Sequence, residues 1–517
     1  MDKLVVLAFF LTQFFSLPLG YFVNGAPITS CNQTPYPDVC NYYMGSSAAI
    51  TAQLDQTRPS FRDTAIQVTL NQAAQAHRYI SSIDTSSFDR AKLAWNDCVE
   101  LYEDSVHHLN KSTSTNNFMD SQTWLSAASA NQRTCENGFL DFNLASHLQT
   151  LPPMLANLTK LISNSLAINK ATIVASSSSL ADGFPGWLSS ADRKLLQTTG
   201  APKADIVVAQ DGSGNFTTIT EAVAAATAVA GGGKRTVIYV KAGVYKEYVD
   251  IGTSAKNITL IGDGIDATII TGSKSNQTGS STSNSATFGV SGDGFVARDI
   301  TFENTAGPEK GQAVAFRSSS DFSALYRCSF KGYQDTLYVY KNHQFYRECD
   351  IYGTVDFIFG DAAAVLQNCN IYIRRPMTGQ ENTVTAQGRE DPHLNTGIII
   401  HNSHVTAAPD LKPVQHLFKS YLGRPWKAYS RTVFMKTTLD DLIDREGWLP
   451  WKGTEYLNTL YYGEYMNTGP GANTSGRVKW AGYHLLTEAE AENFTVENFL
   501  AGNSWIPGTG VPFDAGL

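Results

Sequence analysis

Two octets in the middle of the chain, CSFKGYQD (Cys328 to Asp335) and CDIYGTVD (Cys349 to Asp356), share one pattern. In both, a cysteine, an apolar residue, a glycine and an aspartate stand at the same offsets, and the two copies begin 21 residues apart. Similar segments begin at Ile300 and Cys369, so the recurrence runs at intervals of 28, 21 and 20 residues. Recurrence at about 20–30 residues without intervening helices is typical of a parallel β-solenoid, in which each repeat is one coil.

The segment from residue 204 to 517 has the texture of an all-β domain. Short runs of β-branched and aromatic residues, such as TVIYVKAGVY and AVLQNCNIYI, are separated by Gly, Asn and Asp. This composition favours strands and turns, and almost no amphipathic helix pattern lies between them. We therefore expect residues 204–517 to form a parallel β-helix.

The first part of the chain, residues 27–175, has a helical texture instead. Two stretches, Arg62 to Ile83 and Ala91 to Leu109, place apolar residues at helical spacing on one face. Helical segments with few strand signals predict a small all-α bundle. A serine-rich linker over residues 176–203 separates this bundle from the β domain.

Signals of export stand at the N-terminus and in the linker. Residues 1–26 combine Lys3, an apolar run from Leu4 to Leu19 and a small-residue stretch, the layout of a secretory signal peptide. The run is short and interrupted, which disfavours a membrane anchor, and no later segment approaches transmembrane length. The linker holds a basic sequence accessible to a processing protease, with a solvated turn as the alternative: Arg193, Lys194, Leu195 and Leu196. Eight N-x-S/T sequons predict N-glycosylation: Asn32, Asn110, Asn157, Asn215, Asn257, Asn276, Asn473 and Asn493.

The positions of the seven cysteines suggest cross-links in each domain, and the odd number leaves at least one unpaired. Residues of successive β-helix coils stack at about 4.8 Å. At that spacing Cys349 and Cys369 are in range for a disulfide, and a bond between Cys349 and Cys328 stays open as well. In the helical domain, the expected pairs are Cys31–Cys40 in an N-terminal hairpin and Cys98–Cys135 between successive helices.

Composition and charge exclude several classes of function. The net charge of −8 argues against nucleic-acid binding, which requires a basic face. The chain has no H-E-x-x-H or paired-histidine pattern, so we expect neither a metal ion nor a cofactor.

Coil architecture does not explain the aspartates that end the octets. Stacking Asp335 on Asp356 brings two carboxylates so close that one carboxyl pKa should rise, which yields an acid beside an ionised nucleophile or base. An aspartate ladder that caps turns and a calcium site are the alternatives. Gln312 and Gln334, about one coil apart, favour catalysis, because amide N–H groups bind an oxyanion and not calcium.

Four blocks of the β domain resemble the signature motifs of plant pectin methylesterases. They are GQAVAFRSSSDFSALYRCSFKGYQDTLYVY (Gly311 to Tyr340), GTVDFIFG (Gly353 to Gly360), LGRPW (Leu422 to Trp426) and YMNTGPGANTSGRVKW (Tyr465 to Trp480). The blocks have the family's order and spacing, and the likeness runs from about residue 204 to 510. It implies a right-handed parallel β-helix that hydrolyses the C6 methyl esters of pectin to pectate and methanol.

The resemblance also implies roles for the matching residues. Asp356 corresponds to the nucleophile, and Asp335 to the acid that protonates methanol and then activates water. Gln312 and Gln334 would form the oxyanion hole, and Arg424 would hold Asp356 ionised. The residues expected to contact the substrate are Thr282, Gln312, Arg424, Trp426 and Trp451.

Two positions near these motifs depart from the family pattern. Ser283 stands where an aromatic residue is expected, which weakens the match around Thr282. Ala428 replaces the acidic residue usual after RPWK, a difference that bears on subsite preference.

The helical domain is similar to the pectin methylesterase/invertase inhibitors. The segments NDCVELYEDSVHHL and DSQTWLSAASANQRTCENGF (Asp120 to Phe139) carry this likeness. It implies a four-helix bundle that contains the two N-terminal disulfides. If Cys349 and Cys369 form the disulfide of the β domain, Cys328 is the remaining cysteine and is expected to be a buried free thiol. The domain would be a pro-region, autoinhibitory or assisting export, and a subtilisin-like protease would remove it at RKLL.

The expected partners and setting follow from this resemblance. We expect a secreted monomer in the cell wall or apoplast that acts on methyl-esterified pectin and is bound by proteinaceous pectin methylesterase inhibitors. Two rival functions remain. A calcium-dependent lyase or glycoside hydrolase shares the β-helix, but the chain has no His-Gly dipeptide of the polygalacturonase kind, and a lyase leaves the two glutamines unexplained. The other rival function is that the precursor acts as a binding or inhibitory protein through residues 31–175.

Overall fold

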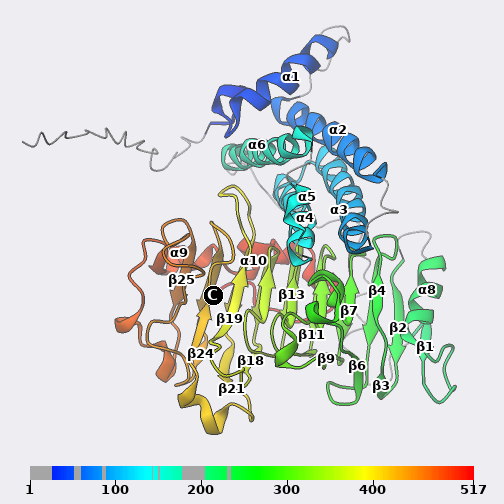
Figure 1. The fold of residues 1–517 in the computed structure, drawn as a ribbon, viewed down its shortest axis with the longest axis vertical. Coiled ribbons are helices and arrows are strands. Elements are labelled where there is room, and N and C mark those ends of the chain that lie inside the picture. Colours follow the sequence, from blue (N-terminus) through cyan, green and yellow to red (C-terminus); the bar gives the residue numbers. More distant parts are fainter. Residues whose placement is uncertain are drawn as a thin grey trace, which may run out of the picture.

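A helical domain and a β-helix follow one another along the chain in the computed structural model (Figure 1). The structure describes residues 26–51, 60–83, 89–142, 144–148, 152–176, 204–229 and 234–517. Residues 1–25 of the expected signal peptide and the whole RKLL processing sequence lie outside the described residues. Within the described ranges, no helix is both long and apolar enough to cross a membrane.

The N-terminal domain is built around four long helices. They are α2 (Phe61–Ser81), α3 (Asp89–Thr113), α4 (Phe118–Asp141) and α6 (Pro153–Ser176). The shorter elements are η1 (Cys31–Gln33), α1 (Pro37–Thr51) and α5 (Ala145–Leu148). Helix α2 packs on α3 and α6, and α4 packs on α3 and α6, which encloses a core that includes Trp95, Leu125 and Phe139. The expected four-helix bundle is therefore confirmed.

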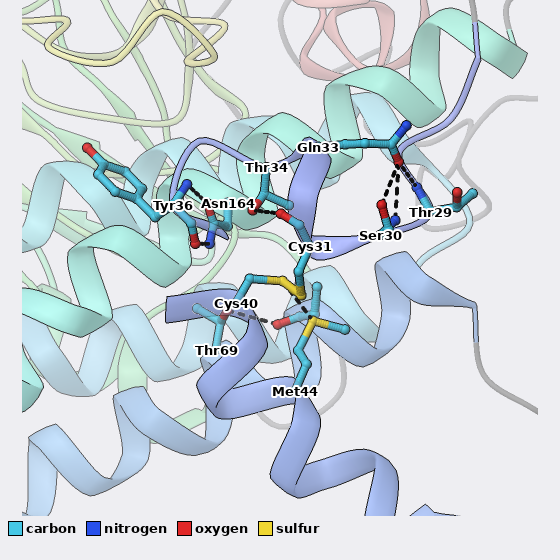
Figure 2. The surroundings of a disulfide bond; sticks show 11 residues. Thr29, Ser30, Cys31, Gln33, Thr34, Tyr36, Cys40, Met44, Thr69 and Asn164 are labelled. Carbon is cyan, nitrogen blue, oxygen red and sulfur yellow. Dashed lines mark hydrogen bonds between the residues drawn. A yellow bond between two sulfur atoms is a disulfide. The ribbon is translucent and has the colours of Figure 1, made fainter. Parts of the chain in front are cut away.

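Two disulfides cross-link the helical domain, and both are the expected pairs. Cys31–Cys40 joins η1 to α1 with its Cα atoms 5.4 Å apart (Figure 2). Beside it, the Asn164 side chain of α6 accepts a hydrogen bond from the Tyr36 backbone N at 2.8 Å and donates one to the Tyr36 carbonyl at 3.0 Å. The second disulfide, Cys98–Cys135, joins α3 to α4. The first disulfide thus closes the N-terminal hairpin, and the Asn164 amide fixes the hairpin to the bundle.

Residues 204–517 wind into three parallel sheets, and the expected parallel β-helix is confirmed. The eleven-stranded sheet contains β1 (Ile206–Val208), β2 (Thr236–Val240), β5 (Ile258–Ile261), β8 (Val296–Arg298), β11 (Ser323–Tyr326), β14 (His343–Arg347), β17 (Ala363–Gln367), β20 (Gly397–His401), β23 (Arg431–Met435), β25 (Tyr461–Tyr465) and β26 (Tyr483–Leu485). The eight-stranded sheet contains β3 (Gly243–Tyr245), β6 (Thr268–Gly272), β9 (Thr301–Asn304), β12 (Ser329–Lys331), β15 (Asp350–Gly353), β18 (Asn370–Ile373), β21 (His404–Ala407) and β24 (Thr438–Leu439). The seven-stranded sheet contains β4 (Val249–Ile251), β7 (Phe288–Val290), β10 (Phe316–Ser318), β13 (Leu337–Val339), β16 (Ile358–Gly360), β19 (Asn382–Gln387) and β22 (Ser420–Gly423).

Three helices pack against the outside of the coils. Helix α8 (Ile219–Val229) contacts the first strands, and α9 (Glu488–Glu492) and α10 (Val496–Leu500) lie in the C-terminal segment. This segment covers the outer face of the eleven-stranded sheet through an apolar cluster that includes Phe345, Val365 and Trp505. The seven-stranded sheet is left to carry the site described below.

The octets are two successive coils of this β-helix. Strand β12 pairs with β15, and β13 with β16, at a constant offset of 21 residues, as in Phe330 against Ile351. The octet glycines allow close packing at the bend, since a Cβ added to Gly353 would lie 2.2 Å from the Cβ of Phe357. The 21-residue recurrence seen in the sequence is therefore one turn of the coil.

The expected disulfide between Cys349 and Cys369 is wrong. Both residues, and Cys328 beside them, are buried free thiols. Parallel coils in register hold equivalent Cα atoms about 4.8 Å apart, a spacing that permits a disulfide but does not require the two sulfurs to turn toward each other. Each thiol donates to a backbone carbonyl instead, for example Cys349 Sγ to the Arg347 carbonyl at 3.4 Å and Cys369 Sγ to the Gln367 carbonyl at 3.5 Å.

The sequon asparagines differ in exposure, and their glycosylation stays a prediction. Five side chains are exposed, those of Asn32, Asn110, Asn215, Asn473 and Asn493. Three are partly buried, those of Asn157, Asn257 and Asn276.

Candidate active site

The two octet aspartates lie at equivalent turns of neighbouring coils. Asp335 stands just before β13 and Asp356 just before β16, and the Asp335 backbone N donates to the Val355 carbonyl at 3.1 Å. Both aspartates have left-handed backbone conformations, with φ of 62° and 52°. Asp adopts this region more readily than most residues, and such backbone strain clusters at functional sites. The turn therefore directs both carboxyl groups into one cavity.

The Asp356 carboxylate is held by three hydrogen bonds. Arg424, which follows β22, donates from Nε to Oδ1 at 2.8 Å and from Nη2 to Oδ2 at 2.7 Å. Thr383 of β19 donates its hydroxyl to Oδ1 at 2.7 Å. Bidentate pairing with arginine stabilises the ionised carboxylate and fixes its plane.

Asp335 has the opposite environment, although it is stacked next to Asp356. Its side chain is buried, and no cation pairs with it among the residues that the structure describes. Burial and the negative charge of Asp356 raise the pKa of Asp335 well above its usual range, against the opposing charge of Arg424. The raised pKa favours a protonated Asp335 beside the Asp356 carboxylate that Arg424 pairs, and the stacking argument predicted a raised pKa for one of the two.

All eight residues singled out from the sequence line a single cavity of about 370 Å³. They are Thr282, Gln312, Gln334, Asp335, Asp356, Arg424, Trp426 and Trp451. The two glutamines lie in neighbouring coils, because the Ala313 backbone N donates to the Gln334 carbonyl at 3.2 Å. The cavity therefore combines amide donors, an acid and a nucleophile in a space that holds a sugar-sized group.

Aromatic rings form part of the wall of this cavity. The Arg424 guanidinium lies 4.5 Å from the ring centre of Trp451. Trp426 contacts Phe359 edge to face at 6.2 Å, and Phe359 stacks on Tyr338 at 4.2 Å. Aromatic faces of this kind suit the apolar faces of sugar rings.

Sequence reasoning missed three residues of the β-helix that shape the site. Thr383 hydrogen-bonds Asp356 from a strand whose sequence carries no distinguishing signal. Tyr338 and Phe359 lie inside the motifs already recognised. Strand alternation could have found Phe359, because adjacent residues of a strand point to opposite faces and Ile358 lies in the interior core.

The helical bundle closes one side of the cavity. The site expected from the sequence contained residues of the β domain only. Residues of α3 and α4 in the lining are Asp97, Thr134, Asn137, Gly138, Leu140 and Asp141. The Asp141 carboxylate accepts a hydrogen bond from the Thr282 backbone N at 3.0 Å. Asp97 accepts one from Asn284 at 2.8 Å, and burial raises its pKa to about 6. Two carboxylates of the bundle thus occupy hydrogen-bonding positions at the edge of the site.

Further charged contacts fix α3 and α4 to the β-helix. Arg133 of α4 is buried and donates to Asp361 at 3.1 Å and to the Gly388 carbonyl at 2.6 Å. Trp124 donates its indole N–H to the fully buried Asp321 at 2.6 Å, and Lys111 pairs with the same carboxylate at 3.0 Å. Each contact joins the bundle to the β-helix, and separating the two domains removes a partner from a buried charged group.

Comparison with known proteins assigns both domains. The family "Pectinesterase" matches residues 205–503, and the family "Plant invertase/pectin methylesterase inhibitor" matches residues 27–168. "Pectinesterase 2" of Citrus sinensis is 55% identical over 493 residues, which are 94% of each chain. "Probable pectinesterase/pectinesterase inhibitor 6" of Arabidopsis thaliana is 52% identical over 535 residues, covering 96% of this chain and 95% of the relative.

Two solved structures match about three fifths of this chain. Pectin methylesterase from carrot is 55% identical, with a TM-score of 0.61, and the match covers 62% of this chain and 100% of the carrot chain. The pectin methylesterase from Aspergillus niger in deglycosylated form is 31% identical, with a TM-score of 0.51, over 59% of this chain and 96% of the other. This chain belongs to the pectinesterase family and carries an N-terminal domain of the plant invertase/pectin methylesterase inhibitor family.

Proposed function

We propose that this pectinesterase cleaves C6 methyl esters of pectin with Asp356 as the nucleophile. An Asp356 oxygen attacks the ester carbonyl carbon, and the bond from that carbon to the methoxy oxygen then breaks. The paired arginine supports this role, because it keeps the carboxylate ionised and aimed into the cavity. Thr383 and Arg424 Nε both donate hydrogen bonds to Oδ1. The other oxygen, Oδ2, accepts a hydrogen bond from Arg424 Nη2.

Asp335 is the acid and then the base in this proposal. Its carboxyl proton passes to the departing methoxy oxygen, which leaves as methanol and leaves an acyl-enzyme anhydride on Asp356. The Asp335 carboxylate then takes a proton from water, and the resulting hydroxide equivalent attacks the acyl carbonyl and releases galacturonate and Asp356. The raised pKa of Asp335 carries this assignment, because only a protonated carboxyl can begin the cycle.

The side-chain amides of Gln312 and Gln334 are placed to stabilise the oxyanion. Each intermediate carries negative charge on the former carbonyl oxygen, and amide N–H groups already oriented in the cavity bind it without reorganisation. Trp426 and Trp451 would hold the sugar rings, and Thr282 would contact the substrate at the side now closed by Asp141.

The bundle acts as an autoinhibitory pro-region in this proposal. A polysaccharide must lie across the cavity, and α3 and α4 occupy that space with Asp97, Asp141 and Leu140. Cleavage at the RKLL sequence by a subtilisin-like protease would free the β-helix after secretion to the cell wall. Free proteinaceous inhibitors of the same family would bind the uncovered face in the same way, and the processed enzyme would be a monomer.

The assignment of Asp356 is tested by Asp356→Asn in the processed enzyme on methylated pectin. We expect methanol release to fall by at least about 10³-fold, because the amide is not a nucleophile. Unsaturated or new reducing ends from the wild type would identify a lyase or glycosidase instead. Unchanged methanol release in the variant would remove Asp356 from the mechanism.

Autoinhibition is tested by replacing Arg193 and Lys194 so that the two domains stay joined. The uncleaved chain should release methanol from pectin far more slowly than the processed enzyme, and undiminished release would refute the shielding. Loss of secretion after deletion of residues 27–175, together with undiminished methanol release by the uncleaved chain, would assign the domain to export instead.

A further inference from the structure

A line of aromatic rings extends along the outer face of the seven-stranded sheet, away from the catalytic pair. Beginning at Trp426, it continues through Phe359 and Tyr338 to Tyr340, with the two tyrosine rings 5.0 Å apart. These rings form one apolar cluster with Ala130 of α4, so the bundle covers them. When the bundle leaves, a continuous aromatic strip beside the cavity becomes exposed, and such strips mark binding surfaces.

Lys341 stands at the far end of this strip. Its side chain is 4% exposed, and its ammonium lies 4.7 Å from the ring centre of Tyr340. The ammonium donates to the Asp104 carboxylate and to the Asn131 amide oxygen. Both acceptors belong to the bundle, so processing removes every hydrogen-bond acceptor of the Lys341 side chain that the described residues supply.

The groups of the bundle that bind Lys341 resemble those that a sugar acid would offer. Asp104 supplies a carboxylate to the ammonium, and its pKa is lowered well below the usual range, where the charges of His108 and Lys341 outweigh the effect of burial. Asn131 supplies a neutral oxygen and also accepts from the Tyr340 hydroxyl at 3.1 Å. A pectin chain offers the same groups, namely carboxylates where it is not esterified, neutral hydroxyl and ester oxygens, and sugar faces for the rings.

The position of Lys341 relative to β13 limits its distance from the catalytic pair. Lys341 lies two residues beyond the end of β13 and six positions after Asp335, a length of chain that spans at most about 20 Å when extended. A single sugar ester at the catalytic pair does not reach that far, whereas neighbouring residues of a polymer do. Lys341 would therefore contact the part of the substrate that flanks the scissile ester.

We propose that Lys341 of the processed enzyme binds the carboxylate of an unesterified galacturonate residue flanking the ester under attack. The bundle occupies this position with Asp104 in the precursor. The inference rests on the proposed pectin methylesterase site and adds a preference to it. Lys341 favours chains that already carry free carboxylates, so ester removal continues next to earlier products.

The test compares two substrates for the processed β-helix, and the whole carrot pectin methylesterase chain matches only 62% of this chain. Methanol release is measured on fully methyl-esterified and on partly de-esterified homogalacturonan oligomers of equal length. Lys341→Gln should raise KM for the partly de-esterified oligomer about tenfold, because a charge-assisted hydrogen bond is lost, and leave kcat unchanged. KM for the fully esterified oligomer should not change. Lys341→Arg should restore the wild-type KM, since it keeps the charge.

A matched control and a second measurement separate this role from a structural one. Lys479→Gln removes one charge from an exposed lysine outside the cavity lining and should alter neither KM. Inhibition by a short unesterified galacturonate oligomer should weaken about tenfold in Lys341→Gln at unchanged Tm. Equal changes on both substrates, or none, would overturn the proposal. Methanol release by the wild type from the fully esterified oligomer tests the proposed function independently of Lys341.

Discussion

Replacing Arg424 with glutamine separates the roles of the two stacked aspartates. The change removes the bidentate cation from Asp356 and leaves only the Thr383 hydroxyl as a donor. In the wild type, Asp356 raises the pKa of Arg424 despite burial of the guanidinium, so the attraction outweighs desolvation. Ionised Asp356 should therefore be strongly disfavoured in the variant.

The magnitude follows from the exposure of the pair. Removing one partner of a buried ion pair costs about 3–5 kcal/mol. The Arg424 side chain is 24% exposed, so solvent screening reduces this to about 2–3 kcal/mol. At about 1.4 kcal/mol per factor of ten, the ratio of ionised to protonated Asp356 at a given pH falls about 30–140-fold.

The assay is the pH dependence of methanol release from methylated pectin. In the proposed mechanism the nucleophile is ionised Asp356, so the acidic limb of the profile should move about 1.5–2 pH units higher in Arg424→Gln. Arg424→Lys keeps the charge and loses the planar fork, so its limb should move less while kcat still falls. The exposed Arg375→Gln serves as the control. An acidic limb at the wild-type position in Arg424→Gln, at any overall rate, would refute the division of roles.

Three further predictions concern docking, packing and the thiols. Burial raises the pKa values of Asp97 and Asp120 from 3.8 to about 6 in the docked state, so the protonated forms of both carboxyls favour docking. Their contribution to the stability of the docked state is complete below about pH 4 and is lost as pH rises through 6. The uncleaved chain should therefore gain activity relative to the processed enzyme between pH 4.5 and 7, and a constant ratio would contradict this. Gly353→Ala should destabilise the β-helix by about 1–3 kcal/mol in denaturant unfolding, whereas Gly252→Ala, with open space around its Cβ, should be neutral. Thiol titration of the unfolded, unreduced β-helix should find three free cysteines, and finding one would restore the disulfide between coils.

The fold was predictable because each coil of the β-helix corresponds to one short repeat in the sequence. Residues one coil apart in sequence must stack, so the octets already set Asp335 beside Asp356 and Gln312 near Gln334. The helical domain was readable for a similar reason, since the 3.6-residue period of its apolar residues depends only on neighbours in sequence. Spacing alone could not decide the state of Cys349, because stacking at about 4.8 Å permits a disulfide without requiring one.

The sequence by itself determined the two domains, the coil period and eight of the residues that line the cavity. Only the tertiary structure decided how the stacked carboxyls differ and what covers them. Arg424 reaches Asp356 from 68 residues away, and the bundle contacts the site from more than 100 residues upstream, as in Asp141 against Thr282. Such contacts depend on the shapes and charges of two assembled surfaces, and no periodicity records them. The same distance explains why Lys341 is unremarked in sequence, since its partners become visible only when α3 and α4 are docked.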